Sequence, residues 1–258
     1  MQDSVYNGVF GAMTQMYRLD TIANNLANVQ TAGFKREEPA FHDVMRRRLH
    51  DVVDPEPTLE SSRLRLDRDL LTQPRISGSH VVFEQGPLQK TDNPLDLAIQ
   101  GEGFFRVGTP QGEAYTRDGR FKLQPDGTVV TANGHALLTA NGPLRVLGNG
   151  PLEVNQAGEV RQNGQVIGRI DLVSFDDLQV LRREGGNLFR LREDSQAAML
   201  PAEGATLAQG YLEKSNVNVV EEMVRMIETN RLFEACQKVV SSTNEQDGQL
   251  IRKLGRSA

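Results

Sequence analysis

Apolar side chains near the start of the chain recur at alternating steps of four and three residues, between positions 4 and 29. This spacing is the heptad seam of a helix that packs against another helix. Such a helix is a rod of roughly 35–40 Å at 1.5 Å per residue, and alone it is marginal in water. The seam residues are Val5, Val9, Ala12, Met16, Leu19, Ala23 and Leu26. The pattern therefore predicts a long helix within residues 1–34 that has a helical partner.

Three asparagines, Asn24, Asn25 and Asn28, lie close together near the end of this predicted helix. Asn is a modest helix former, so such a cluster needs a reason. The residues alone leave two interpretations open, namely a fraying polar helix end or side-chain amides that bond to neighbouring subunits. Gly33 can adopt the left-handed conformation of a C′ cap, which predicts that the helix ends there.

A second long amphipathic stretch lies at the other end of the chain, within residues 214–258. Asn218 can cap a helix there, and Glu221 at the third helical position completes a capping box. The helix would run for about 35 residues, far above the globular mean of 11–12. Its predicted apolar side consists of Val220, Met223, Val224, Ile227, Phe233, Val240 and Leu250.

The two terminal helices are expected to pair, which gives a discontinuous coiled-coil domain built from both ends of the chain. Two paired helices bury one seam and leave their outer faces exposed. The apolar face of the first helix is widened beyond one seam by Val9, Phe10, Met13, Tyr17 and Ile22. One partner cannot cover this surplus, so we expect contacts with other copies or with other proteins.

Residues 81–213 have a different pattern, in which short apolar or alternating runs are separated by turn pairs about eight residues apart. These dipeptides supply the positive φ angles of tight hairpins. The pairs are Asp118-Gly119, Asp126-Gly127, Asn133-Gly134, Asn141-Gly142 and Asn163-Gly164. We predict an all-β domain, a sandwich or an irregular barrel, inserted between the helices. The predicted fold class is α+β.

The connecting segment, residues 35–80, has a weaker signal. Phe41, Val44, Met45 and Leu49 have the spacing of one short amphipathic helix. The polar residues 54–80 show little periodicity, so we predict a loop or an extended arm.

Composition narrows the function classes. With 38% hydrophobic and 24% charged residues, the chain of 258 residues is globular rather than wholly disordered. Aromatic residues make up only 5% and Trp is absent, a mild point against a small-molecule enzyme. The net charge of −5 argues against nucleic-acid binding. The sequence has no run of about 18 apolar residues, so no membrane-spanning helix is expected. The N-terminal residues do not have the pattern of a cleaved signal peptide.

Candidate chemistry is sparse. The carboxylates of the central segment share no diagnostic spacing for acid/base catalysis, and the four histidines lack metal-ligand spacing. Gly101-Glu102-Gly103 lacks the third glycine and the helix of a phosphate loop. Cys236 has apolar neighbours, which predict a small buried side chain rather than a nucleophile. We therefore expect neither an enzyme nor a cofactor or metal site.

Three spaced motifs carry a family resemblance. The first is IANNLAN at 22–28 with TAGFK at 31–35. The second is NPLDLAIQGEGFF at 93–105 with YTRDGRF at 115–121. The third is SNVNVVEEM at 215–223 with ETNR at 228–231. Their type and order resemble the signatures of the axial proteins of the bacterial flagellum, which are rod, hook and hook-junction subunits.

The resemblance implies a structural subunit of the basal-body rod, the helical drive shaft that transmits motor torque. It implies a location in the rod across the periplasm, reached through the flagellar export apparatus without a cleaved signal peptide. Its implied partners are other copies of the chain and adjacent rod proteins. The terminal helices would form an inner tube and fold on assembly. The resemblance also favours intersubunit contacts for the asparagine cluster.

Within the family, the proximal rod type is preferred, because the segment after Lys35 is rich in Arg and Glu. A distal rod or hook subunit is the alternative, and an extracellular β-domain binding module on a helical stalk is the alternative from another class. The predicted assembly interface consists of Val5, Val9, Ala12, Met16, Leu19, Ala23, Asn24, Asn25, Leu26, Asn28, Val220, Met223, Ile227, Phe233 and Val240.

Overall fold

The computed structural model describes residues 2–47, 70–146, 148, 150–192, 195 and 198–254. The chain divides into two compact units. Unit 1 comprises Met1–Asn24, Glu38–His80 and Val220–Ala258, and unit 2 comprises Asn25–Glu37 and Val81–Val219. Two long helices and a β-rich domain confirm the predicted α+β class.

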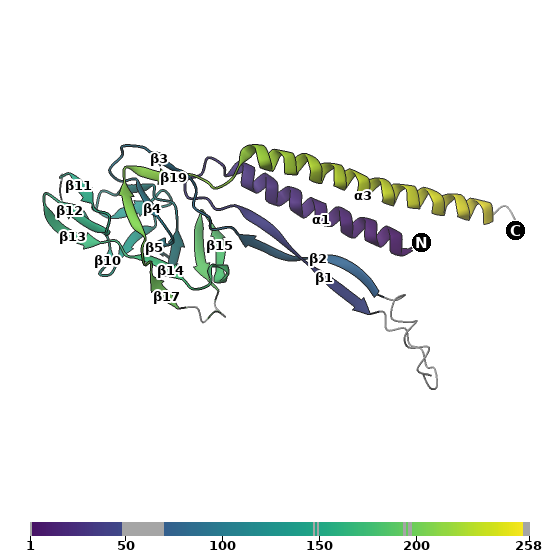
Figure 1. The fold of residues 1–258 in the computed structure, drawn as a ribbon, viewed down its shortest axis with the longest axis horizontal. Coiled ribbons are helices and arrows are strands. Elements are labelled where there is room, and N and C mark those ends of the chain that lie inside the picture. Colours follow the sequence, from purple (N-terminus) through teal and green to yellow (C-terminus); the bar gives the residue numbers. More distant parts are fainter. Residues whose placement is uncertain are drawn as a thin grey trace, which may run out of the picture. The chain divides into compact units, whose positions relative to one another are not determined.

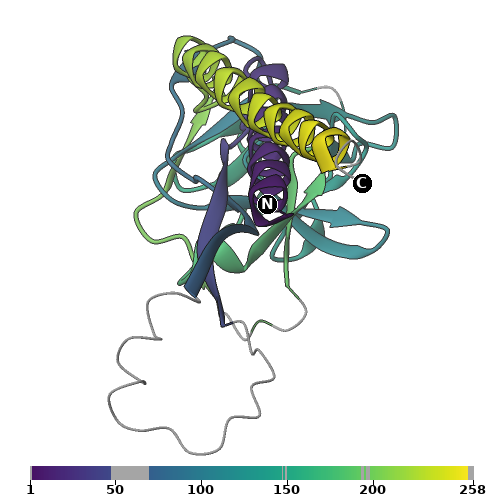
Figure 2. The same cartoon turned by 90° about the vertical axis from the view of Figure 1, so that its right-hand side faces the viewer.

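Unit 1 contains most of α1 (Gln2–Ala27) and α3 (Val219–Leu254), which lie side by side and antiparallel (Figures 1 and 2). The two helices approach closely where α1 has glycines. A Cβ atom on Gly8 would lie 2.7 Å from Val240 Cγ2, and one on Gly11 would lie 3.1 Å from Cys236 Sγ. Since such distances are too short for ordinary packing, the missing side chains of these two glycines permit the contact.

Unit 1 also contains a β ribbon that the sequence analysis missed. Strands β1 (Glu37–Arg47) and β2 (Leu70–Val81) form a two-stranded sheet, so the helix predicted from Phe41, Val44 and Met45 is wrong. A short apolar run does not distinguish helix from strand, and Pro39 within the segment disfavours a helix interior. Residues 70–80 belong to a strand rather than to a loop, while Leu49 and residues 54–69 lie outside the described residues.

Unit 2 is built around a ten-stranded sheet. Its strands are β5 (Phe104–Thr109), β6 (Gly112–Thr116), β7 (Phe121–Leu123), β8 (Val129–Thr131), β9 (Ala136–Thr139), β10 (Gly142–Pro143), β14 (Leu172–Phe175), β15 (Leu181–Gly185), β16 (Leu188–Leu191) and β17 (Met199–Pro201). The main path is β15-β16-β6-β5-β9-β8-β7, with β10 on β9, β14 on β5 and β17 on β14. A short 3-10 helix, Leu178–Val180, precedes β15.

Three small sheets complete unit 2. They consist of β11 (Leu152–Val154), β12 (Glu159–Gln162) and β13 (Gln165–Arg169); of β4 (Leu97–Gln100) with β18 (Thr206–Gln209); and of β3 (Leu88–Lys90) with β19 (Tyr211–Glu213). The pairings in these sheets are antiparallel. Residues 166–175 belong to β13 and β14, and residues 205–212 belong to β18 and β19.

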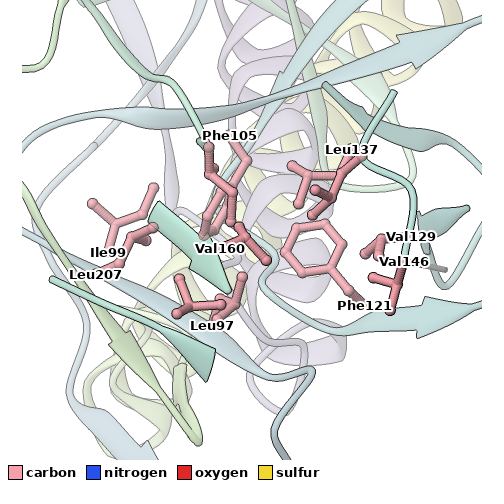
Figure 3. Packing of buried hydrophobic residues seen from close by; sticks show 12 residues of the cluster. Leu97, Ile99, Phe105, Phe121, Val129, Leu137, Val146, Val160 and Leu207 are labelled. Atoms are coloured by element: carbon pink, nitrogen blue, oxygen red, sulfur yellow. The ribbon is translucent and has the colours of Figure 1, made fainter. Parts of the chain in front are cut away.

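Side chains from several of these sheets share one hydrophobic core (Figure 3). Phe105 and Phe121 pack edge to face there, with ring centroids 5.2 Å apart. A second cluster is richer in aromatic rings and includes Phe104, Tyr115 and Phe189. These two clusters hold the strands in register, so the connecting loops of unit 2 have a rigid support.

The predicted turn glycines are of two kinds. Gly127, Gly134, Gly142 and Gly164 have positive φ, as the turn pairs predicted. Gly119 does not belong to this set, and a Cβ atom there would overlap the carbonyl group of Leu97. Gly119 is therefore required for close backbone approach rather than for a left-handed turn.

Candidate functional site: a buried ionic joint and an exposed helical surface

Residues of the first two sequence motifs meet Glu213, which lies two positions before the third motif, in a cluster of unit 2. We call this cluster of Lys35, Arg117 and Glu213 the ionic joint. Lys35 Nζ lies 2.6 Å from Glu213 Oε1, and the two side chains are 0% and 1% exposed. Arg117 contacts the other carboxylate oxygen at 3.3 Å and is also buried. The Gly86 amide donates a further hydrogen bond, at 2.9 Å, to Oε1. Both oxygens of a fully buried carboxylate are thus satisfied, as burial of a charge demands.

The ionic joint holds two cations and one anion. Burial lowers the pKa of the Lys35 ammonium and of the Arg117 guanidinium, and the negative charge of Glu213 opposes both shifts. Backbone carbonyl groups supply additional negative dipoles. Lys35 Nζ donates to the Glu84 carbonyl at 2.6 Å, and Arg117 donates to the Gly101 carbonyl at 2.8 Å. Glu213 is therefore a carboxylate in direct contact with both cations.

The ionic joint brings the N-terminal and C-terminal motifs together. The Gly33 amide donates to the Glu213 carbonyl at 2.7 Å. Asn216 Oδ1 accepts from the Arg36 amide at 2.7 Å, and its Nδ2 donates to the Val82 carbonyl at 2.9 Å. Residues 33–36 are consequently fixed beside residues 213–216.

Gly33 and Phe34 fit into this arrangement for steric reasons. Gly33 has a φ of +66°, and a Cβ atom there would overlap the backbone of Arg117. Since α1 ends at Ala27, Gly33 is not its C′ cap, and the predicted helix end is wrong. The Arg183 guanidinium lies 4.4 Å from the centre of the Phe34 ring and donates to the Lys35 carbonyl. Burial lowers the pKa of Arg183.

The asparagine cluster is divided by the structure. Asn25 is buried, and its amide forms two hydrogen bonds of 3.0 Å with the backbone N–H and C=O of Glu37. Asn28 accepts a hydrogen bond from the Thr31 hydroxyl at 3.2 Å, and Asn24 is exposed. The Asn25 amide thus has an intramolecular role. That the asparagine cluster contacts other subunits stays a prediction.

In unit 1, some of the predicted interface residues surround a hollow of about 430 Å³ between α1 and α3, which we call the interhelical hollow. From the predicted set it is lined by Val9, Ala12, Met16, Phe233 and Val240. Met13, Gln237, Ser241 and Asn244 complete the lining. The structure therefore brings together parts of both predicted seams and leaves an uncharged depression between them.

The remaining predicted residues lie elsewhere. Val220, Met223 and Ile227 are 70%, 52% and 55% exposed. At 100° per residue, Val220 and Ile227 lie about 120–160° around α3 from Phe233 and Val240, and Met223 lies about 80–100° from them. The single apolar side predicted for this helix is therefore two separate faces. On α1, Leu19 and Leu26 are half-buried and Ala23 is exposed, while the side chain of Val5 lies outside the described residues.

Sequence reasoning missed Glu213 and Arg183, because neither has a diagnostic neighbour along the chain. The available signal was Lys35, a cation within an otherwise apolar motif, which needs a counter-ion if it is buried. In the part of the chain that the structure describes, no group of three or more His, Cys, Asp or Glu side chains is placed to bind a metal ion. Within the same residues, no helix is both long and apolar enough to span a membrane.

The family model described as flagella basal body rod protein matches residues 6–35, the flagellar hook protein FlgE/F/G D1 domain matches 98–168, and the flagellar basal body rod FlgEFG protein C-terminal matches 208–253. The chain is 38% identical to flagellar basal-body rod protein FlgF of Caulobacter vibrioides, with 99% of each chain covered. It is 34% identical to FlgG of Buchnera aphidicola subsp. Acyrthosiphon pisum, over 99% of this chain and 100% of that one. It is 32% identical to FlgG of Bacillus subtilis, over 97% and 98%. The chain belongs to the flagellar basal-body rod protein family.

Proposed function

We propose that this protein is a structural subunit of the flagellar basal-body rod, and that its terminal helices make the subunit contacts. The observation that carries the proposal is the apolar surface of unit 1. Large apolar side chains are exposed on α1 at Tyr6, Val9, Phe10, Met13 and Met16, and on α3 at Val220, Met223, Val224, Ile227, Leu232 and Val239. Soluble monomers rarely expose contiguous apolar patches of this extent, so partner proteins are expected to cover them.

Assembly rather than chemistry is the proposed mechanism. Contact between different surfaces of identical subunits, when the rotation does not close, produces a helical filament. We propose that the contact between α1 and α3 continues as a coiled coil, and that residues 1–34 and 214–258 form the axial core. Residues 81–213 form the β domain, and residues 35–80 connect the two. A filament of this kind is the shaft that transmits torque.

The partners in this proposal are other copies of the chain and adjacent rod proteins, with Asn24 and Asn28 among the contact residues. The chain would reach the rod through the flagellar export apparatus. Among rod positions, we propose the proximal one, on the composition of the segment after Lys35.

Incorporation into basal bodies tests this function. In a strain that lacks the gene, the full-length chain should restore motility and should copurify with basal bodies on immunoblots. Chains lacking residues 1–30 or 220–258 should be absent from those preparations, although cell lysates contain them. Absence of the full-length chain from purified basal bodies, or normal incorporation of either truncated chain, would contradict the proposal.

A further inference from the structure

Helix α3 has two apolar faces, and only one of them contacts α1. The first includes Phe233 and Val240 and borders the interhelical hollow. The second, which we call the outer face, consists of Val220, Met223, Val224 and Ile227, each at least half exposed. These four residues span about two helical turns, roughly 10 Å along the axis. A helix with two apolar faces needs two partners, and α1 is only one of them.

The interhelical hollow has the size and the apolar character of a surface that could receive the outer face of α3. No charged residue lines it, and its volume is about 430 Å³. Its α1 side extends from Val9 to Met16, again roughly 10 Å along the helix axis. The hollow and the outer face therefore agree in length and in their apolar, uncharged character.

The two surfaces cannot meet within one chain. The outer face and the α3 side of the hollow are centred about 15 residues apart, which is roughly 22 Å along one straight helix. Every copy of the chain nevertheless carries both surfaces. A contact between them in two copies is head to tail, and it leaves one free surface at each end for further copies.

From this complementarity we propose that the outer face of α3 in one copy inserts into the interhelical hollow of a second copy. The inference rests on the proposed rod function and specifies the contact that propagates the filament. The flanking carboxylates Glu221 and Glu228 stay at the rim, because burial of a charge in an uncharged hollow would be costly.

Disulfide crosslinking in assembled rods tests the contact. The background variant is Cys236→Ala, which removes the chain's one cysteine. Met13→Cys in the hollow is combined with Met223→Cys on the outer face. Because Gly11 lies opposite Cys236 on antiparallel helices, Met13 and Met223 of one chain are separated by roughly 16 Å along the axis. This exceeds the Cα–Cα limit of about 7 Å for a disulfide, so only two copies can form one.

The matched control replaces Met13→Cys by Tyr6→Cys. Tyr6 and Met13 are 59% and 58% exposed on the same helix, but Tyr6 does not line the hollow. After oxidation of purified basal bodies, a ladder of dimers and higher oligomers of this chain is expected for the Met13/Met223 pair and not for the Tyr6/Met223 pair. An incorporated Met13/Met223 variant without a ladder, or one crosslinked only to another rod protein, overturns the inference and leaves the proposed function intact. Failure of the wild-type chain to enter basal bodies removes the function itself.

A second pair of variants covers the case in which the cysteine variant does not incorporate. Val224 on the outer face is 50% exposed on α3, and Ala235, which belongs to neither surface, is also exposed on this helix. Burial of a charge in the contact should reduce incorporation of the Val224→Asp variant by at least about tenfold, whereas Ala235→Asp should stay within about twofold of wild type. Equal effects of the two substitutions overturn the inference.

Discussion

The ionic joint predicts an unusual order of mutational effects. Removing the anion with Glu213→Gln leaves Lys35 and Arg117 buried with no carboxylate between them. Removing one cation with Lys35→Met leaves Arg117 and Glu213 as a neutral pair. Glu213→Gln should therefore destabilise unit 2 more than Lys35→Met does, although both substitutions break the same 2.6 Å contact.

The magnitudes follow from the partners that remain. Loss of one member of a buried ion pair costs about 3–5 kcal/mol, and Glu213→Gln should lie at or above the top of that range because it strands two charges. Lys35→Met removes one donor from the Glu84 carbonyl and from Glu213. Each acceptor keeps another donor, from Gly86 or Asn216, and a hydrogen bond to a charged group contributes about 1.5–3 kcal/mol, so about 2 kcal/mol is expected for this variant.

Hydrogen–deuterium exchange of the full chain, read on peptides that cover β4 and β5, measures the opening of unit 2 alone. The matched control is Lys90→Met, which breaks the 2.8 Å contact between Lys90 and Asp92, two exposed side chains. Exposed pairs contribute little, so exchange should not change in this variant. A larger effect of Lys35→Met than of Glu213→Gln would show that Glu213 is not the charge on which the joint depends.

Four further outcomes are expected. Gly8→Leu should separate α1 from α3 and reduce the helical circular dichroism, because even a Cβ atom at Gly8 would lie 2.7 Å from Val240 Cγ2. Addition of Val240→Ala should restore part of this signal, and no restoration would contradict the packing. Asn25→Ala should cost about 1–3 kcal/mol in urea unfolding, because two hydrogen bonds to the Glu37 backbone are lost, and an unchanged urea midpoint would refute this. The pKa of Lys35 is lowered in the folded chain, so the unfolded chain binds the Lys35 proton more tightly. The free energy of unfolding of wild type, relative to that of Lys35→Met, should therefore rise as the pH increases toward 10.5. A difference in urea midpoint that does not change with pH would contradict this sign. Removal of residues 1–30 should leave the amides of unit 2 protected from exchange. Removal of residues 1–36 should not, because it also removes Lys35 from the ionic joint. Equal protection of unit 2 in the two truncated chains would contradict the role of the joint.

The parts of the fold that depend on local pattern were predictable. The α+β class, the two long helices and the β-rich middle are confirmed, because helical periodicity and turn dipeptides act over a few residues. The β1–β2 ribbon was not predictable in the same way. Strand β1 pairs with residues far along the chain, and the short apolar run near Phe41 fits a helix equally well.

The ionic joint shows a stronger limit of sequence reasoning. Lys35 and Glu213 are separated by 178 positions, and Arg117 and Glu213 by 96. In a sequence a charged residue is most simply interpreted as solvated, since Lys, Arg and Glu are almost never fully buried unless they are paired. Only the three-dimensional structure shows that Glu213, two positions before the third motif, is the counter-ion of Lys35 in the first motif and of Arg117 in the second.

The motif residues and the helical surfaces therefore have two different roles, one within the chain and one between chains. Gly33, Lys35, Arg117 and Asn216 act within the chain, because they fix the segments on either side of the ionic joint. The outer face of α3 and the interhelical hollow are available to other chains. For a rod subunit the first role is as necessary as the second. Residues 33–36 follow α1 in the chain and residues 213–216 precede α3, and the joint binds these two segments together. A variant that weakens the joint while leaving both helical surfaces intact should therefore still incorporate but yield rods that transmit torque poorly.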